Sequence, residues 1–188
     1  CPEEHRAFIT ILALTGLRKS EIFRLSWDWC DFEKGRLLIK VAKRGENEMP
    51  MSARVREALL SLGPRAEGRV FPGSFRDKSG KERCDGTKLI TNKRHAIANA
   101  LAAAKVDPVG VAYHTFRRTF VTLVEALPGV SYGVVRALAR HSASSHDMTE
   151  RYLYVSEDRL RLALEQLDEQ VLGPSNVILF PQVQGARG

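Results

Sequence analysis

The chain has 188 residues and a mass of 21.0 kDa, which suits one domain or slightly more. Because 44% of the residues are hydrophobic and 27% are charged, the chain can bury a core, and wholesale disorder is excluded. Lys and Arg exceed Asp and Glu by 29 to 22, giving a net charge of +7 and a pI near 9.6. Such an excess favours a polyanionic partner, most often nucleic acid, although a soluble domain that is merely basic accounts for the charge equally well.

The cysteines and the apolar runs indicate the cellular compartment. Cys1, Cys30 and Cys84 form neither a CxxC pair nor a disulfide framework, which favours a reducing compartment. No stretch has the length of a membrane span and no signal-peptide pattern is present. We therefore expect a cytoplasmic protein without membrane contact. The start at Cys1 rather than Met suggests a fragment of a longer protein.

The first half of the chain predicts helices around a small sheet. Apolar residues recur at helical spacing after Pro2 and stop at Gly16, and Ser20 is expected to cap a second, short helix. Alternating residues then predict an antiparallel sheet of three strands. Its strands are expected at about 28–32, 36–42 and 47–51, with Lys43-Arg44-Gly45-Glu46 as the second turn.

The second half is expected to be helical. Ser52 caps a helix that Gly63-Pro64 stops, and residues 72–94 form a basic surface loop that either faces DNA or is simply solvated. The remaining helices are predicted at 97–104, 115–127, 131–139, 148–154 and 156–171.

Reactive side chains stand at marked positions along this pattern: Arg18, Lys43, His114, Arg117, His141 and Tyr152. Arginine binds two phosphate oxygens at once through its planar fork, so this set suits a phosphate. No carboxylate cluster, zinc spacing or glycine-rich nucleotide loop is present, so we expect neither a metal nor another cofactor. Phosphoryl transfer without a metal needs arginines to neutralise charge, and Tyr152 is a candidate nucleophile.

Three segments, ALTGLRKSE at 13–21, HTFRRTF at 114–120 and TERYLYVS at 149–156, resemble the signature boxes of the tyrosine recombinases, the phage-integrase family. The order Arg, hairpin Lys, His-x-x-Arg, His, Tyr is also similar, and the resemblance runs from about residue 4 to 170. It implies an α+β, mainly helical catalytic domain over 1–173 with a three-stranded antiparallel sheet at one edge. It also implies a tail over 174–188 and an N-terminal core-binding domain that this chain lacks.

The resemblance assigns a role to each residue. Arg18 and Arg117 would hold the non-bridging oxygens of the scissile phosphate. Tyr152 would attack phosphorus and form a 3′-phosphotyrosine, with His114 as acid or base, because a phenol is mostly neutral at pH 7. Lys43 would protonate the leaving 5′-oxygen and His141 would hydrogen-bond the phosphate. Glu21 is expected to buttress Arg18.

The implied protein is a site-specific DNA recombinase, an integrase of a prophage or another mobile element. It would act on double-stranded DNA as a homo-tetramer, being a monomer or weak oligomer without DNA, and accessory DNA-bending factors are possible partners. The covalent intermediate stores the energy of the broken bond, so neither ATP nor a metal is needed. In a bacterium the protein would lie in the cytoplasm, on the nucleoid when DNA-bound.

The sequence departs from the family pattern near the second histidine. The family usually has Leu-Gly-His, whereas this chain has Ala139-Arg140-His141, and the segment from Ser142 to Asp147 is longer than usual. Tyr154 stands where the family often has His, but the register of 149–156 favours Tyr152 as the nucleophile. The apolar run at 177–180 is expected to dock on a neighbouring protomer or on its own domain.

Two other readings stay open on the sequence. A type IB topoisomerase-like enzyme that nicks and closes DNA would share this chemistry. A DNA-binding module that retained the fold without activity is the other, and the complete set of six residues argues against it.

Overall fold

The computed structural model describes residues 2–41, 45–73, 75–76, 82–83, 93–140 and 155–173. The helices of this part are α1 (Pro2–Thr15), α2 (Lys19–Arg24), α3 (Ala53–Ser61), α4 (Arg94–Ala103), α5 (Tyr113–Ala126), α6 (Tyr132–Ala139) and α7 (Glu157–Leu172). The strands are β1 (Cys30–Asp31), β2 (Arg36–Val41), β3 (Gly45–Pro50), β4 (Phe75–Arg76) and β5 (Glu82–Arg83), and a 3-10 turn, η1, covers Trp27–Trp29.

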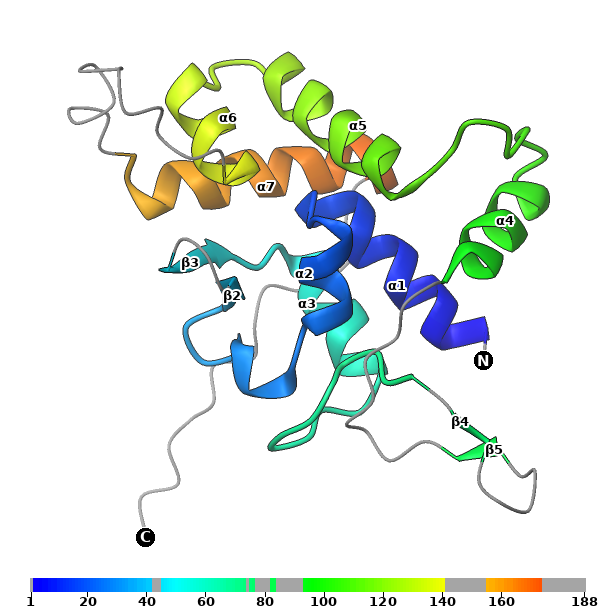
Figure 1. Cartoon of the computed structure of the whole chain (residues 1–188). Coiled ribbons are helices and arrows are strands. Elements are labelled where there is room, and N and C mark those ends of the chain that lie inside the picture. Colours follow the sequence, from blue (N-terminus) through cyan, green and yellow to red (C-terminus); the bar gives the residue numbers. More distant parts are fainter. Residues whose placement is uncertain are drawn as a thin grey trace, which may run out of the picture.

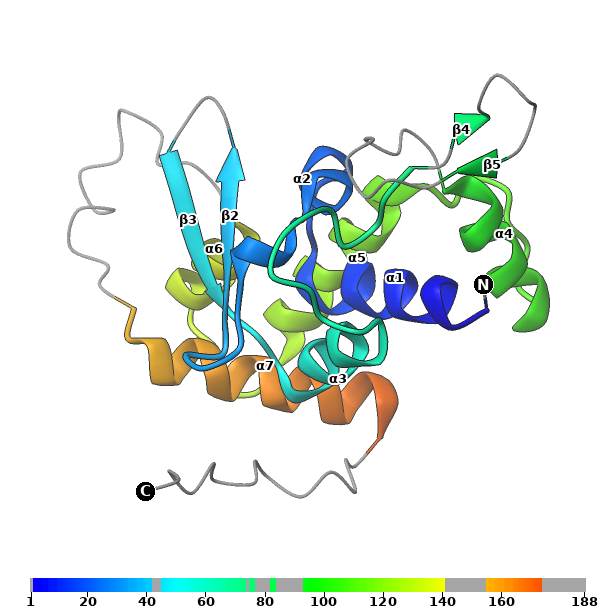
Figure 2. The same ribbon diagram turned by 90° about the horizontal axis from the view of Figure 1, so that it is seen from below.

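Helix α1 runs through the middle of the molecule, and the other elements surround it (Figure 1). It packs against α3, α4, α5 and α7. Strands β2 and β3 form one edge, whereas α4 and the short β4–β5 pair lie at the opposite edge in both views (Figures 1 and 2). The expected fold class, mainly helical with a three-stranded antiparallel sheet at one edge, is confirmed.

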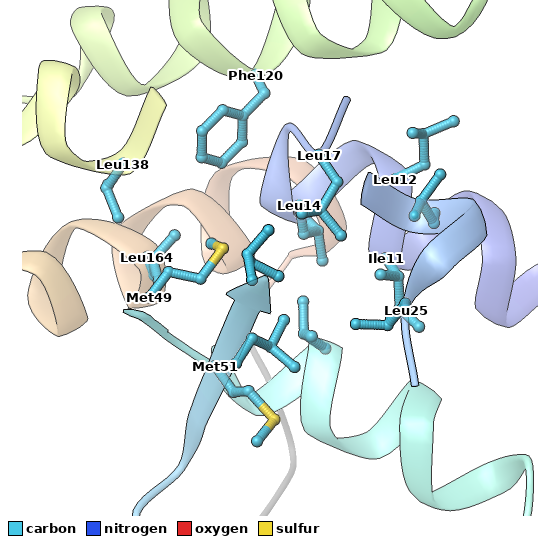
Figure 3. Packing of buried hydrophobic residues seen from close by; sticks show 14 of the residues in the cluster. Ile11, Leu12, Leu14, Leu17, Leu25, Met49, Met51, Phe120, Leu138 and Leu164 are labelled. Atoms are coloured by element: carbon cyan, nitrogen blue, oxygen red, sulfur yellow. The ribbon is translucent and has the colours of Figure 1, made fainter. Parts of the chain in front are cut away.

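The core is built on the apolar side of α1. Phe8, Ile11, Leu12 and Leu14 are almost entirely buried, and their spacing follows the helical repeat that the sequence predicted. Side chains from α5, α6, α7 and the sheet converge on this cluster, among them Phe120, Leu138, Leu164 and Met49 (Figure 3). The same cluster therefore holds all the elements that carry the described candidate residues.

The sheet has the order β1-β2-β3 with antiparallel pairing. Leu37 faces Met49 across the β2–β3 pair, and Leu37 and Ile39 are buried while Lys40 is exposed, as the alternation predicted. The predicted boundaries of the first and third strands were wrong. Residues 27–29 form η1, which leaves β1 only Cys30–Asp31, and Gly45 and Glu46 belong to β3 because Val41 pairs with Gly45.

Aromatic contacts fix the beginning of α5. Tyr113, the first residue of this helix, meets Phe23 of α2 edge-on at 5.3 Å and Phe8 of α1 at 6.4 Å between ring centroids. Its hydroxyl accepts a hydrogen bond of 2.7 Å from the backbone N–H of Lys93, just before α4. Such edge-to-face pairs add stability beyond area burial. The first turn of α5 is thus held against α1 and α2.

An ionic contact joins the start of α7 to the sheet. Glu157 accepts hydrogen bonds from Arg36 of β2 through both carboxylate oxygens, with Arg36 Nε 3.1 Å from Oε1, and from Arg161 one turn along α7. Arg36 also donates to Glu48 of β3 at 2.8 Å. The resulting arginine bonds lower the pKa of Glu157. The first turn of α7 is therefore tied to both long strands.

The other helical predictions agree with the structure to within a few residues, including the Ser52 cap of α3, whose hydroxyl accepts the Val55 N–H at 3.3 Å. The cap predicted for α2 was wrong, because Arg18 rather than Ser20 precedes that helix. The β4–β5 pair, inside the predicted basic loop, was not expected. The predicted helix at 148–154 and the apolar run at 177–180 lie outside the described residues.

Candidate active site

The candidate site is organised around the turn from Thr15 to Arg18 between α1 and α2. Gly16 has a φ of +55°, and a Cβ at this position would lie 2.4 Å from Cδ1 of Phe120. Only glycine fits both restrictions without strain. The Thr15 hydroxyl donates to the Ile11 carbonyl and accepts the Leu17 N–H at 3.3 Å. The chain therefore turns sharply against α5 and presents the Gly16 carbonyl to the arginines described below.

Arg18 is the N-cap residue of α2 and is only partly covered. Its backbone N–H and its Nη1 each donate to the Glu21 carboxylate at 2.7 Å, to Oε2 and Oε1 respectively. Glu21 at the third helical position thus closes the first turn of α2 in the manner of a capping box. The Arg18 side chain stays 46% exposed, so it can also meet a ligand from solvent. The expected contact between Glu21 and Arg18 is present.

Arg117 lies in α5 and is buried, with its guanidinium against the same turn. Nη1 donates to the Gly16 carbonyl at 2.7 Å, and Nη2 donates to the carbonyl of Ala139 at the end of α6. Burial, reinforced by repulsion from Arg140 and Arg18, lowers the pKa of Arg117 to about 10. The side chain is therefore still charged at pH 7, and a nearby anion would relieve that repulsion.

A third arginine, which the sequence analysis did not single out as a site residue, completes this cluster. Arg140 follows α6 in the left-handed conformation, with φ of 50° and ψ of 44°, which costs a non-glycine residue about 1–2 kcal/mol. Its side chain is only 3% exposed, and Nη2 lies 3.2 Å from Oε2 of Glu21. Burial lowers the pKa of Arg140, and the Glu21 carboxylate opposes that shift.

Glu21 balances only part of this charge. Burial alone would raise the pKa of Glu21, but Arg140 and the donors of Arg18 outweigh burial and lower it. In the described part of the chain, Glu21 is the carboxylate whose charge acts on Arg117 and Arg140. Three guanidinium groups thus share one carboxylate, and the cluster keeps an excess of positive charge. Such a site favours an anion with oxygen acceptors.

The structure brings together only some of the predicted residues. Arg18 and Arg117, which are far apart in sequence, meet at one turn. His114 is exposed in the first turn of α5, one turn before Arg117, and faces outward where Arg117 is buried. Lys43, His141 and Tyr152 lie outside the described residues. Lys43 is flanked in sequence by the paired residues Val41 and Gly45, His141 directly follows Arg140, and Tyr152 shortly precedes α7.

Sequence reasoning missed Arg140 although a signal was available. The chain has Ala139-Arg140-His141 where the family usually has Leu-Gly-His. A long cationic side chain in place of glycine, next to a box of site residues, indicates that the side chain has a partner. The partner, Glu21, could not be read from the sequence, because it lies 119 residues away.

Comparisons with known proteins identify the family to which the chain belongs. Residues 2–159 match the Phage integrase family, so the chain belongs to that family. It is 31% identical over 180 residues to the prophage integrase IntF of Escherichia coli strain K12, and the match covers 92% of this chain and 35% of that protein. The integrase of mycobacterium phage Brujita superposes with a TM-score of 0.63 at 25% identity, over 88% of this chain and 52% of that one. The chain therefore spans about a third to a half of these relatives.

Proposed function

We propose that this chain is the DNA-cleaving and rejoining part of a site-specific recombinase of a prophage or related mobile element. The observation that carries the proposal is the excess positive charge at the Thr15–Arg18 turn. There Arg18 and Arg140 contact the Glu21 carboxylate, and Arg117 contacts the Gly16 carbonyl beside them. A phosphodiester bears one negative charge and two non-bridging oxygens, which this cluster can neutralise and hydrogen-bond. Family membership and the integrase relatives support the same assignment.

In the proposed reaction, Arg18 and Arg117 hold the two non-bridging oxygens of the scissile phosphate. Charge on those oxygens grows as phosphorus becomes pentavalent, so fixed guanidinium groups stabilise the transition state more than the bound DNA. Arg117 is pre-positioned by two carbonyls that occupy two of its five N–H donors, which leaves the others for the phosphate. Arg18 is exposed enough to close on the DNA from the solvent side.

Tyr152 supplies the nucleophile in this proposal. Its oxygen forms a bond to phosphorus while the bond to the 5′-oxygen breaks, which gives a 3′-phosphotyrosine and a free 5′-hydroxyl. His114 takes the phenolic proton, Lys43 delivers a proton to the leaving 5′-oxygen, and His141 hydrogen-bonds the phosphate. The bond energy is kept in the phosphotyrosine, so the strand can be rejoined without ATP, and the arginines take the part that a metal ion plays elsewhere.

The proposed assembly is a homo-tetramer on two duplexes of double-stranded DNA, in which two rounds of exchange pass through a Holliday junction. An N-terminal core-binding domain in the longer protein would close a clamp around each site, and accessory DNA-bending factors would assist. The tail at 174–188 would dock on its own domain or on a neighbour. None of the helices in the described part of the chain has the length and apolar character that crossing a bilayer requires.

The nucleophile gives the direct test of this function. A suicide DNA substrate with a nick close to the scissile phosphate traps the covalent adduct, which is read on a denaturing gel. Tyr152→Phe is expected to bind DNA as the wild type does and to form no adduct, whereas the matched variant Tyr154→Phe still forms one. An adduct with Tyr152→Phe and none with Tyr154→Phe would overturn the assignment of the nucleophile.

The same substrate separates the functional classes. Loss of the adduct in Arg18→Ala supports cleavage at this site, whereas absence of an adduct in the unaltered protein would favour a DNA-binding module without chemistry. Strand exchange between two duplexes distinguishes a recombinase from an enzyme that only nicks and closes DNA. A protein that forms the adduct and relaxes supercoils, yet never exchanges strands, would be of the second kind.

A further inference from the structure

Arg140 has a backbone conformation that is unusual for its residue type. This residue ends α6 in the left-handed region, at φ 50° and ψ 44°, which glycine adopts freely and arginine does not. The family that the sequence resembles usually has glycine at this place. A side chain that is kept at a strained position indicates that it contributes something a glycine would not.

The side chain of Arg140 points into the protein and uses both ends of its fork. Nη1 donates to the carbonyls of Thr15 at 3.2 Å and Leu138 at 3.1 Å, and it also lies 3.0 Å from Sδ of Met49 in β3. Nη2 donates to the Gly16 carbonyl at 3.1 Å and to Oε2 of Glu21 at 3.2 Å. One guanidinium therefore joins the end of α6, the sheet and the turn between α1 and α2.

Each of the two proposed phosphate ligands shares an acceptor with Arg140. The Gly16 carbonyl accepts hydrogen bonds from Nη1 of Arg117 and from Nη2 of Arg140. The Glu21 carboxylate accepts hydrogen bonds from both Arg18 and Arg140. In addition, Nη2 of Arg18 donates to the backbone carbonyl of Arg140 at 3.3 Å. Because Arg140 is almost completely buried, it reaches the DNA only through these neighbours.

We propose that Arg140 is a positioning residue whose guanidinium fork holds the Gly16 carbonyl and the Glu21 carboxylate, and thereby aims Arg117 and Arg18 at the scissile phosphate. The inference rests on the proposed function of those two arginines. It assigns to position 140 a task that depends on planar, two-ended hydrogen bonding and not on charge alone. A lysine has one ammonium group and cannot span the same four oxygens.

The test uses this 188-residue chain, saturating suicide DNA and three substitutions of Arg140. Arg140→Met removes the fork and the charge, and Arg140→Lys keeps the charge. Arg140→Gly relieves the backbone strain but leaves the Gly16 carbonyl to Arg117 alone and the Glu21 carboxylate to Arg18 alone. All three are expected to slow single-turnover adduct formation about 100-fold, the loss typical of a misplaced catalytic group. DNA affinity, measured by fluorescence anisotropy, should change less than about 3-fold, since Arg140 does not reach the DNA. Arg136→Met, which removes the arginine one turn earlier, within α6, is the matched control and should cleave at the wild-type rate.

Folding and positioning are separated by two measurements. Rates are expressed per folded molecule, from near-ultraviolet circular dichroism at the assay temperature. In a double-mutant cycle, Glu21→Gln with Arg140→Met should be no slower than the slower single variant, because both changes break one network. A loss of the adduct rate that merely followed the folded fraction, or fully additive losses in the cycle, would contradict the positioning role.

The Arg18→Ala variant distinguishes failure of the positioning role from failure of the proposed function. If Arg18→Ala abolishes the adduct while folded Arg140→Met or Arg140→Lys cleaves at the wild-type rate, Arg140 has no positioning role and the proposed function stands. If Arg18→Ala itself cleaves normally, the proposed function fails, and with it the premise of the inference.

Discussion

Two helix starts in this molecule use a buried carboxylate in opposite ways. At the start of α2, Glu21 accepts three N–H groups from Arg18 and Arg140, and its pKa is lowered. At the start of α3, Asp168 of α7 accepts the Arg54 N–H at 3.1 Å through Oδ2, while its Oδ1 is buried without a hydrogen-bond partner. Burial raises the pKa of Asp168, and the hydrogen bonds from the Arg54 N–H and the Ser52 side chain only partly oppose that shift.

Asp168 makes a structural contact, whereas Glu21 belongs to a charged site. Asp168 ties α7 to α3, and a neutral hydrogen-bond acceptor could do the same. Glu21 is needed as an anion, because without it two guanidinium groups of the cluster would lose their countercharge. Breaking a buried ion pair on one side leaves an uncompensated charge, which is far more destabilising than removing the charge of a carboxylate, such as Asp168, whose ionised form is disfavoured by burial.

Glu21→Gln is expected to have the largest effect in this comparison. It should lower the free energy of unfolding by about 3 kcal/mol, the usual cost of an unpaired buried charge. Adduct formation should fall about 100-fold at saturating DNA, because Arg18 loses its buttress. Asp168→Asn is the matched control, with unfolding stability at pH 7 no lower than that of the wild type. Urea denaturation of both variants measures the difference, and equal destabilisation would remove the distinction between the two helix starts.

Gly16→Ala disturbs the start of α2 without changing any charge. Its methyl group would meet the Phe120 ring, and its φ is positive, so we expect a loss of about 3 kcal/mol in unfolding free energy. Gly110→Ala is the matched control, because Gly110 also has a positive φ, of +77°, but nothing lies within 4 Å of its added Cβ. That variant should lose about 1 kcal/mol from backbone strain alone. Similar losses in the two melting curves would show that the contact with Phe120 relaxes at little cost.

Ser52→Ala probes the start of α3 and its contact with Asp168 of α7. The serine hydroxyl accepts the Val55 N–H, so its removal should cost about 1 kcal/mol of stability, as for other N-caps. Because α3 carries no residue of the candidate site, the adduct rate per folded molecule should not change. A slower rate in fully folded protein would mean that α3 also shapes the active site.

The pH dependence of stability gives the subtlest distinction. The lowered pKa of Glu21 makes its stabilisation complete above its unfolded pKa of about 4.3, and this contribution is lost as the pH falls through the folded value. The raised pKa of Asp168 has the opposite sign, because the folded state binds the proton more tightly and loses stability as the pH rises from about 4. The urea midpoint of Asp168→Asn should therefore rise relative to that of the wild type as the pH increases from 4 to 7. A constant difference would place the Asp168 carboxyl in a solvated environment.

The sequence predicted the fold well because its signals are local. The apolar spacing of α1, the Ser52 cap and the alternation of β2 are each readable within a few residues, and all are present. The errors also have local causes. Glu21 binds the Arg18 N–H and so fixes the start of α2 before Ser20, and the Trp27–Trp29 segment closes a 3-10 turn where a strand was expected.

Only the candidate site residues that lie within a recognisable sequence motif could be predicted. Arg18 and Arg117 were named from their boxes, and the structure brings both to the Gly16 turn. What could not be predicted is how they are held, because the acceptors are carbonyls of Gly16 and Ala139 and the third guanidinium comes from Arg140. Contacts between residues 22 to 124 positions apart leave no periodic trace in a single sequence.

Arg140, with its left-handed backbone conformation at the end of α6, also restricts how this sequence can evolve. Arginine and glycine codons differ by a single base, so the exchange at position 140 is mutationally accessible. Yet the two states are not interchangeable, since glycine would take one donor away from each of the Thr15, Gly16 and Glu21 oxygens. Conversely, arginine in a relative lacking Glu21 would be buried without its countercharge. Positions 21 and 140 should therefore vary together among homologues, and a lineage that reverts to glycine would need a compensating change beside Glu21.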